Sequence, residues 1–179
     1  MNIPRSFVTL VIAALFSGCS TTLPVNYIPS ATMRGSGDIS PGTFRYIPAE
    51  KRLVAPNQFQ SADFAIGEIY TSEPVTALIR NAVRKELVAA GFSTEPGAPL
   101  TINGEITKFL YDWIGYVEVD FYLDITFHVL RNGNEIMVYN ASSHQSAPKT
   151  MTQDTEAVRA AISKCIDDFF LEARSKKTF

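Results

Sequence analysis

Histidine and cysteine are scarce in this sequence, with two of each among 179 residues. So few imidazole and thiol groups leave little material for a metal cluster, and no zinc-ligand spacing is present. A glycine-rich phosphate loop and a dinucleotide-binding fingerprint are also missing. We therefore expect neither a bound metal nor a cofactor.

An excess of positive charge is missing too. The chain has 16 basic and 18 acidic residues and a formal net charge of −2. Removing residues 1–18 takes away only Arg5, which leaves 15 basic residues against 18 acidic ones, or −3. A mildly acidic protein lacks the electrostatic footprint that binds nucleic-acid phosphates or anionic lipid headgroups. No nucleic-acid partner is expected.

The N-terminus carries a distinctive pattern. Arg5 is the only charged residue before Arg34, and residues 7–16 form a mostly apolar run. A basic start, a short apolar stretch and small residues at positions 17 and 18 are typical of a secretory signal peptide, and the stretch is too short for a transmembrane helix. Residues 1–18 are therefore predicted to direct export.

The end of this segment, Ser17-Gly18-Cys19, resembles the lipobox of bacterial lipoprotein precursors. Phe16 stands where that pattern usually has an aliphatic residue, whereas Gly18-Cys19 matches it. The resemblance implies cleavage before Cys19 and attachment of fatty acyl chains such as palmitate to Cys19, which would anchor the chain in a membrane. Ser20 in place of Asp implies, again through the resemblance, the outer membrane with the domain facing the periplasm; the inner membrane is the less favoured alternative. A plain signal peptide with an incidental cysteine is the competing interpretation.

Cys165 is the other cysteine, so a lipid on Cys19 would leave no intramolecular disulfide to form in the oxidising envelope. It lies on the apolar stripe of a predicted helix, where a thiol behaves as a small hydrophobe. A buried Cys165 is predicted, with intermolecular pairing as the alternative.

Residues 19–61 are rich in proline and glycine and show little apolar periodicity. This composition predicts a lipidated, partly extended tether. Fully stretched, about 40 residues at about 3.3 Å each would span on the order of 130 Å. The stretch 43–47 is the one place where a short edge strand is a reasonable alternative, ended by Pro48.

Residues 62–179 are predicted to form a periplasmic α+β domain. Its expected elements are a strand at 62–70, a helix with Ser72 as its N-cap and its stop at Gly91, and strands at 100–111, 117–129 and 135–144. A last helix has an apolar stripe from Val158 to Phe169. One apolar sheet face and two amphipathic helices predict a two-layer sandwich, β-α-β-β-β-α, with a mainly antiparallel sheet and both helices on one face.

The clearest periodicity lies at residues 117–129, where every second residue is apolar. Strict alternation predicts a half-buried strand of an antiparallel sheet. Asn132-Gly133 favours a type I′ hairpin turn into the next strand. On the strand at 100–111 the residues expected to face the core are Leu100, Ile102, Ile106 and Leu110.

Candidate catalytic residues do not form a convincing set. Asp120, Asp124 and His128 share a strand face, but residues four apart on a strand lie about 13 Å apart at about 3.3 Å per residue, too far to share one ion. Ser143 and His144 are neighbours on a strand and should point to opposite faces. We therefore predict no catalytic residue and no enzymatic activity; an envelope hydrolase is the least favoured alternative.

Aromatic residues gather around the predicted hairpin between the second and third strands: Phe109, Tyr111, Trp113, Tyr116 and Tyr122. Exposed aromatics with polar neighbours are enriched where proteins meet partners, so these residues are predicted to form a partner surface. The alternative is that residues 38–60 fold back over them as a structural lid.

The order of elements is similar to that of the YajG-like family of bacterial outer-membrane lipoproteins. The likeness covers residues 62–174 and is carried by the helix that begins at Val75 and ends at Ala90-Gly91-Phe92, by Ile102-Asn103-Gly104-Glu105-Ile106 and by the last helix, together with Gly18-Cys19. It implies an outer-membrane lipoprotein and transfers no catalytic residue. A looser likeness is to auxiliary lipoproteins of envelope ABC transport systems.

Together these features predict a lipid-anchored, non-enzymatic interaction or assembly module with an envelope protein as its partner. An accessory subunit of an ABC-type lipid or solute transport system is the alternative.

Overall fold

The computed structural model describes residues 20–30, 32–62, 67–114 and 117–179. The predicted signal peptide, Cys19 and Tyr116 lie outside these ranges. The strands are β1 (Ser20–Leu23), β2 (Ile39–Tyr46), β3 (Gln60–Ser61), β4 (Glu68–Thr71), β5 (Leu100–Ile114), β6 (Glu118–Arg131) and β7 (Asn134–Pro148), and the helices are α2 (Ile47–Glu50), α3 (Val75–Ala90) and α4 (Met151–Ser175).

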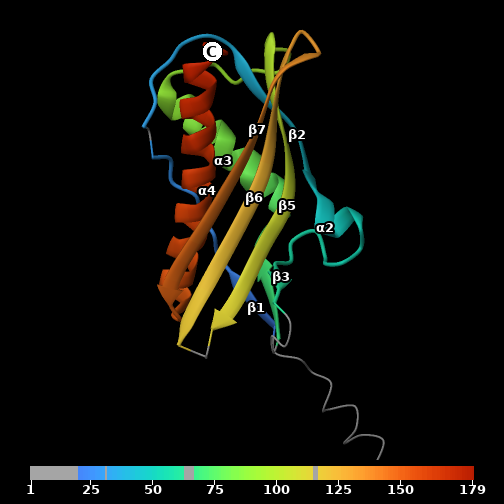
Figure 1. Cartoon of the computed structure of the whole chain (residues 1–179), viewed down its shortest axis with the longest axis vertical. Coiled ribbons are helices and arrows are strands. Elements are labelled where there is room, and N and C mark those ends of the chain that lie inside the picture. Colours follow the sequence, from blue (N-terminus) through green and yellow to red (C-terminus); the bar gives the residue numbers. More distant parts are fainter. Residues whose placement is uncertain (1–19, 31, 63–66, 115–116) are drawn as a thin grey trace, which may run out of the picture.

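One long, twisted sheet forms the first layer of the fold (Figure 1). Its order is β2-β5-β6-β7, and β3 pairs with the end of β5 beyond β2. β5, β6 and β7 are antiparallel to one another, whereas β2 and β3 run parallel to β5. β1 and β4 form a separate parallel pair. The predicted α+β class with a mainly antiparallel sheet is confirmed.

Helices α3 and α4 form the second layer, on the same face of the sheet, as predicted (Figure 1). Gly91 ends α3 with φ 101°, a left-handed conformation that glycine adopts without strain. Ser72 is not the N-cap of α3, because Pro74 holds that position. Thr150 caps α4, accepting a hydrogen bond from the backbone N–H of Gln153 at 3.3 Å.

The inner face of β6 is the centre of the core. Every second residue from Val119 to Val129 is buried, which confirms the alternation, and only the first expected member, Val117, is exposed. The ring of Phe127 stacks on Phe169 of α4 at 4.4 Å between centroids, so the sheet and the helix share one hydrophobic layer. Asn132 and Gly133 both have positive φ, 50° and 82°, as a type I′ turn requires.

The faces of β5 change halfway along the strand. The pairing of β5 with β6 shifts register between Ile106 and Lys108, which is a β-bulge. One extra residue inverts the alternation beyond that point, so Phe109 and Tyr111 face the core and Leu110 does not. The prediction that Leu110 continues the core face is therefore wrong.

The largest correction concerns residues 20–61. In place of an extended tether, the described part of this stretch contains β1, β2, α2 and β3, and its buried residues belong to the same core as the helices. Proline does not prevent this, because β2 is an edge strand paired only with β5 and its register is irregular between Pro41 and Phe44. The ring of Phe44 lies over Gly104, where any Cβ would clash with it.

Candidate functional site

The described residues of the predicted aromatic partner surface, Phe109, Tyr111, Trp113 and Tyr122, do not share one exposed surface. Phe109 and Tyr111 are buried, and Phe59 of the predicted tether stacks on Phe109 at 4.4 Å between ring centroids. The alternative of a lid formed by residues 38–60 thus accounts for these two rings, and the prediction that they contact a partner is wrong. Trp113 and Tyr122 are half-buried, on different parts of the molecule.

Trp113 belongs to a polar cluster where β5 ends and α4 begins. The hydroxyl of Tyr111 donates a hydrogen bond to Asp154 Oδ2 at 2.6 Å, and the ammonium of Lys149 lies 2.8 Å from the centroid of the Trp113 ring. Burial raises the pKa of Asp154 and lowers that of Lys149. Burial, followed by the bond to Asp154, raises the pKa of Tyr111. This cluster joins the sheet to the first turn of α4.

Tyr122 lies on the outer face of the sheet, opposite the helices. Its ring stacks on His144 of β7 at 4.4 Å with 4° between the ring planes, and Lys108 Nζ lies 5.0 Å from its centroid. His144 Nε2 lies 2.8 Å from Asp120 Oδ1, and the Asp120 carboxylate is buried beneath it. The result is a stacked pair of rings with acidic and basic neighbours from three adjacent strands, β5, β6 and β7.

The structure does not bring the candidate catalytic residues Ser143, His144 and His128 together. Ser143 is buried on the inner face while His144 is exposed, so the predicted opposition of these two side chains is confirmed. His128 Nδ1 lies 2.6 Å from Glu135 Oε2, which ties β6 to β7. Within the described ranges, no three His, Cys, Asp or Glu residues are grouped so that they could hold a metal ion.

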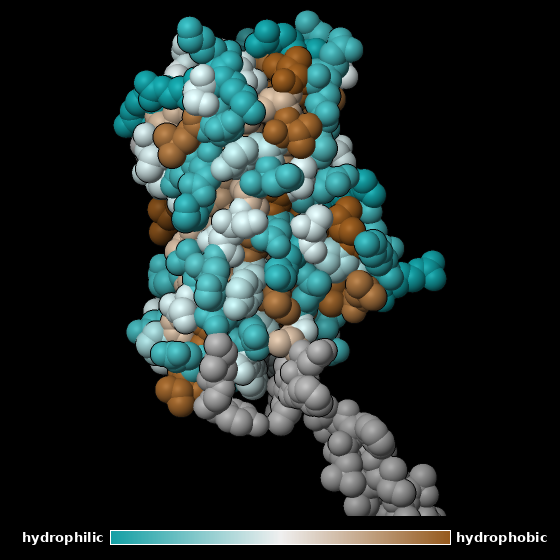
Figure 2. Space-filling view, viewed as in Figure 1, coloured by the Kyte–Doolittle hydropathy of each residue, from teal (hydrophilic) through white to brown (hydrophobic). Residues whose placement is uncertain are grey.

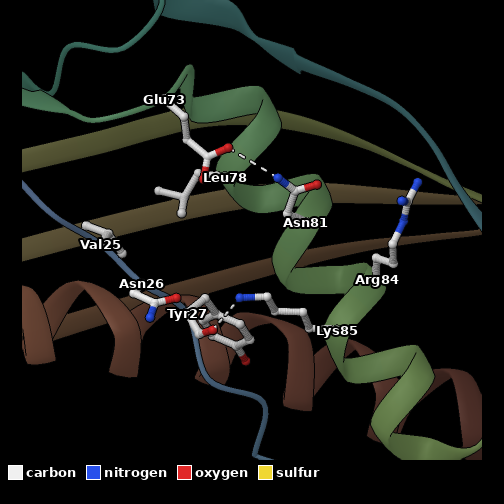
Figure 3. Close-up of a pocket in the computed structure, with 8 residues that line it drawn as sticks. All are labelled: Val25, Asn26, Tyr27, Glu73, Leu78, Asn81, Arg84 and Lys85. Carbon is white, nitrogen blue, oxygen red and sulfur yellow. Dashed lines mark hydrogen bonds between the residues drawn. The ribbon is translucent and has the colours of Figure 1, made fainter.

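A pocket of about 180 Å³ lies between α3 and the N-terminal segment, which we define as residues 24–30 and 32–35 (Figure 3). Its walls are Val25, Asn26, Tyr27, Glu73, Leu78, Asn81, Arg84 and Lys85. Several of its polar side chains already have partners, because Lys85 Nζ donates to the Tyr27 carbonyl at 2.8 Å and Asn81 Nδ2 donates to Glu73 Oε2 at 3.2 Å. These bonds connect the lining residues to one another.

Next to this pocket, a buried carboxylate holds the N-terminal segment in place. Glu86 accepts hydrogen bonds from the Tyr27 hydroxyl and from the Ser30 backbone N–H, the latter at 2.6 Å. Burial, followed by the bond to Glu86, raises the pKa of Tyr27. On α4, Asp167 accepts from the Ser30 and Thr32 hydroxyls at 3.0 and 2.7 Å. The segment is therefore fastened to both helices.

The sequence contains a signal for Glu86 that sequence reasoning missed. The residue falls at the same helical spacing as Ala82 and Ala90, on the apolar stripe of α3. A carboxylate at a core position of an amphipathic helix requires a buried hydrogen-bond donor. Here the donors are Tyr27 and Ser30, in the segment that had been predicted to be an extended tether.

Solved structures share this fold. A protein of the family DUF330 from Xanthomonas campestris matches with a TM-score of 0.64 and 9% sequence identity, over 90% of this chain and 100% of its own. An uncharacterized protein matches with a TM-score of 0.51 and 12% identity, over 86% of this chain and 97% of its own. A minor lipoprotein from Acinetobacter baumannii has a TM-score of 0.40 and 12% identity, over 75% of this chain and 92% of its own.

At these identities the first two similarities show the fold alone, and the third is too slight to support a conclusion. No family model and no curated protein matches the sequence. The likeness to YajG-like lipoproteins remains a prediction.

Proposed function

We propose that this chain is a bacterial lipoprotein, anchored through lipid on Cys19 and acting as a non-enzymatic interaction module in the envelope. The observation that carries the proposal is the position of the lipobox-like Gly18-Cys19, which directly precedes the folded domain at Ser20. A cleavage site needs to be at such a boundary, because processing there leaves the whole domain intact. The described helices include none long and apolar enough to cross a membrane.

The proposed location is the outer membrane, with the domain in the periplasm. Ser20 in place of Asp supports this location only through the resemblance to lipoproteins. The mildly acidic composition supports a periplasmic protein partner more than a polyanionic one.

The anchor is tested by labelling growing bacteria with a fatty acid that can be detected on the protein. Cys19→Ala should abolish the label and leave the precursor uncut, because the thiol is the proposed site of acylation. Cys165→Ala is the matched control, since that thiol is buried, and it should keep the label. Label retained in Cys19→Ala would contradict the proposal.

The outer face of the sheet is the proposed docking surface for the protein partner. The stacked rings of Tyr122 and His144 offer flat contact area that loses little conformational entropy on binding, and Lys108 adds a positive charge beside the Tyr122 ring. Figure 2 shows hydrophobic residues scattered among hydrophilic ones on the side of the molecule that faces the viewer. A partner that bound there would need polar complementarity as well as ring contacts.

A photo-crosslinking residue placed at Tyr122 tests this surface in intact cells. It should capture one defined protein, whereas the same probe at Leu171, which is 67% exposed on α4, should not. Equal capture at both positions would contradict the proposed surface. Capture of transporter permease components would favour the alternative of an accessory subunit of an ABC-type system.

A further inference from the structure

One end of the molecule collects the beginning of β1, the end of β5, the beginning of β6 and the beginning of α4 (Figure 1, lower end). The first residue of β1, Ser20, pairs there with Glu68 of β4. The backbone N–H of Lys149 donates to the Val117 carbonyl at 2.9 Å, which joins the β5–β6 connection to the residues that lead into α4. We call this region the anchored end and define it by Ser20, Trp113, Val117, Lys149 and Met151.

The position of Ser20 leaves no spacer between the proposed lipid and the fold. Consecutive Cα atoms are about 3.8 Å apart, so Cys19 lies one residue from a hydrogen-bonded strand. The chain that follows β1 is fastened to α3 and α4 through Glu86 and Asp167, so it cannot serve as a spacer without breaking those bonds. A lipid on Cys19 would therefore hold this end of the domain against the membrane surface.

The side chains at the anchored end suit that position. Val117 and Met151 are 72% and 57% exposed although both are apolar. Beside them, the Lys149 ammonium lies over the half-buried Trp113 ring. Apolar tips next to a tryptophan and a lysine are the combination that proteins place at a membrane–water interface, where the rings and the lysine stem are apolar and the ammonium stays hydrated.

Charge indicates which lipid surface fits. Glu68 and Glu118 are exposed at this end, and Lys149 is the cation among the residues that define it. An anionic surface would repel the carboxylates, whereas a zwitterionic one would not. A surface of neutral headgroups is thus the better match.

We propose that the anchored end rests on the bilayer, with Val117 and Met151 inserted among the headgroups of a zwitterionic lipid surface. This inference rests on the proposed acylation of Cys19. In this arrangement the domain contacts the membrane directly, whereas the composition had predicted a long tether between the two.

The test uses the full acylated protein in phosphatidylethanolamine–phosphatidylcholine vesicles, with an environment-sensitive fluorophore on one introduced cysteine at a time. The variants are Val117→Cys and Met151→Cys, with Asn132→Cys and Leu171→Cys as controls. The β6 strand has 14 residues and is about 43 Å long at about 3.3 Å per residue, and Asn132 follows its last residue, at the end opposite Val117. Leu171 is an exposed apolar residue on α4 like Met151, but about 30 Å further along the helix at about 1.5 Å per residue.

The native Cys165 does not interfere with labelling. It is fully buried, and burial raises the pKa of its thiol to about 12, so it is neither accessible nor ionised at neutral pH. Each variant therefore carries a single fluorophore.

Brominated lipid tails in the vesicles should quench most of the emission from positions 117 and 151 and leave positions 132 and 171 unchanged. Equal emission at all four positions on protein that floats with the vesicles would overturn the inference while leaving the lipid anchor standing. Protein purified from membranes that does not float, and carries no acyl chain by mass spectrometry, would overturn the proposed function and this inference together.

Discussion

Phe59 tests whether the stretch predicted to be a tether is part of the core. Its side chain is fully buried, stacked on Phe109 at 4.4 Å and edge-on to Phe121 at 5.7 Å between centroids. Core Phe→Ala substitutions destabilise by about 3–5 kcal/mol, and each aromatic pair contributes about 0.5–1.5 kcal/mol beyond its buried area. Phe59→Ala should therefore lower the free energy of unfolding by about 4–5 kcal/mol.

Denaturant unfolding of the domain without residues 1–18 measures this change directly, and the thermal midpoint should fall by roughly 8–20 °C for a domain of this size. Leu53→Ala is the matched control, because Leu53 belongs to the same stretch but is 69% exposed. That control should change stability by less than about 0.5 kcal/mol. If Phe59→Ala were equally harmless, residues 38–60 would not be packed on the domain and the argument for a lid would be refuted.

Four further predictions use urea unfolding, its dependence on pH, or limited proteolysis. Phe121→Ala should cost about 3–5 kcal/mol, whereas Tyr122→Ala on the outer face should cost about 0.5–1.5 kcal/mol, and the reverse order would mean that the faces of β6 are misassigned. Tyr111→Phe should cost about 1–3 kcal/mol by leaving a buried carboxylate without its donor, and adding Asp154→Asn should recover most of that loss. Because burial raises the pKa of Asp154, the folded state binds the proton more tightly than the unfolded chain, so the wild type loses stability as the pH rises from the ordinary carboxyl pKa through the raised one. A stability profile of Asp154→Asn that falls as steeply there as that of the wild type would contradict this assignment. Glu86→Ala should release the N-terminal segment to proteolysis with the core intact, and unchanged cleavage would show that its hydrogen bonds do not hold that segment.

The long elements of the domain were predictable because each obeys a local rule. The alternation along β6 and the positive φ angles favoured by Asn132-Gly133 follow from strand geometry and turn chemistry. The apolar stripe of α3 and its stop at Gly91 follow from helix geometry. None of these features depends on contacts with distant parts of the chain.

The bulge in β5 could not be predicted in this way. An extra residue near Thr107 is accommodated only because β6 continues on a shifted register, from Ile125 to Asp124. The aromatic residues beyond it carry no local sign of which face they occupy. Their burial depends on Phe59, which is distant in sequence and reaches them through β3.

The sequence alone determined the export-like N-terminus, the amphipathic helices and the alternating strands. The helices and strands could be predicted because a hydrophobic period of 3.6 or 2 residues is visible in neighbouring positions of the sequence. Tertiary structure decided the position of residues 20–30 and 32–61. Their prolines and glycines exclude regular structure locally, yet β2 gains its hydrogen bonds from β5, and the N-terminal segment gains its own from Glu86 and Asp167. Those partners lie far along the chain, so only the folded domain brings these contacts together. They turn the expected tether into a packed segment that begins next to the proposed membrane anchor.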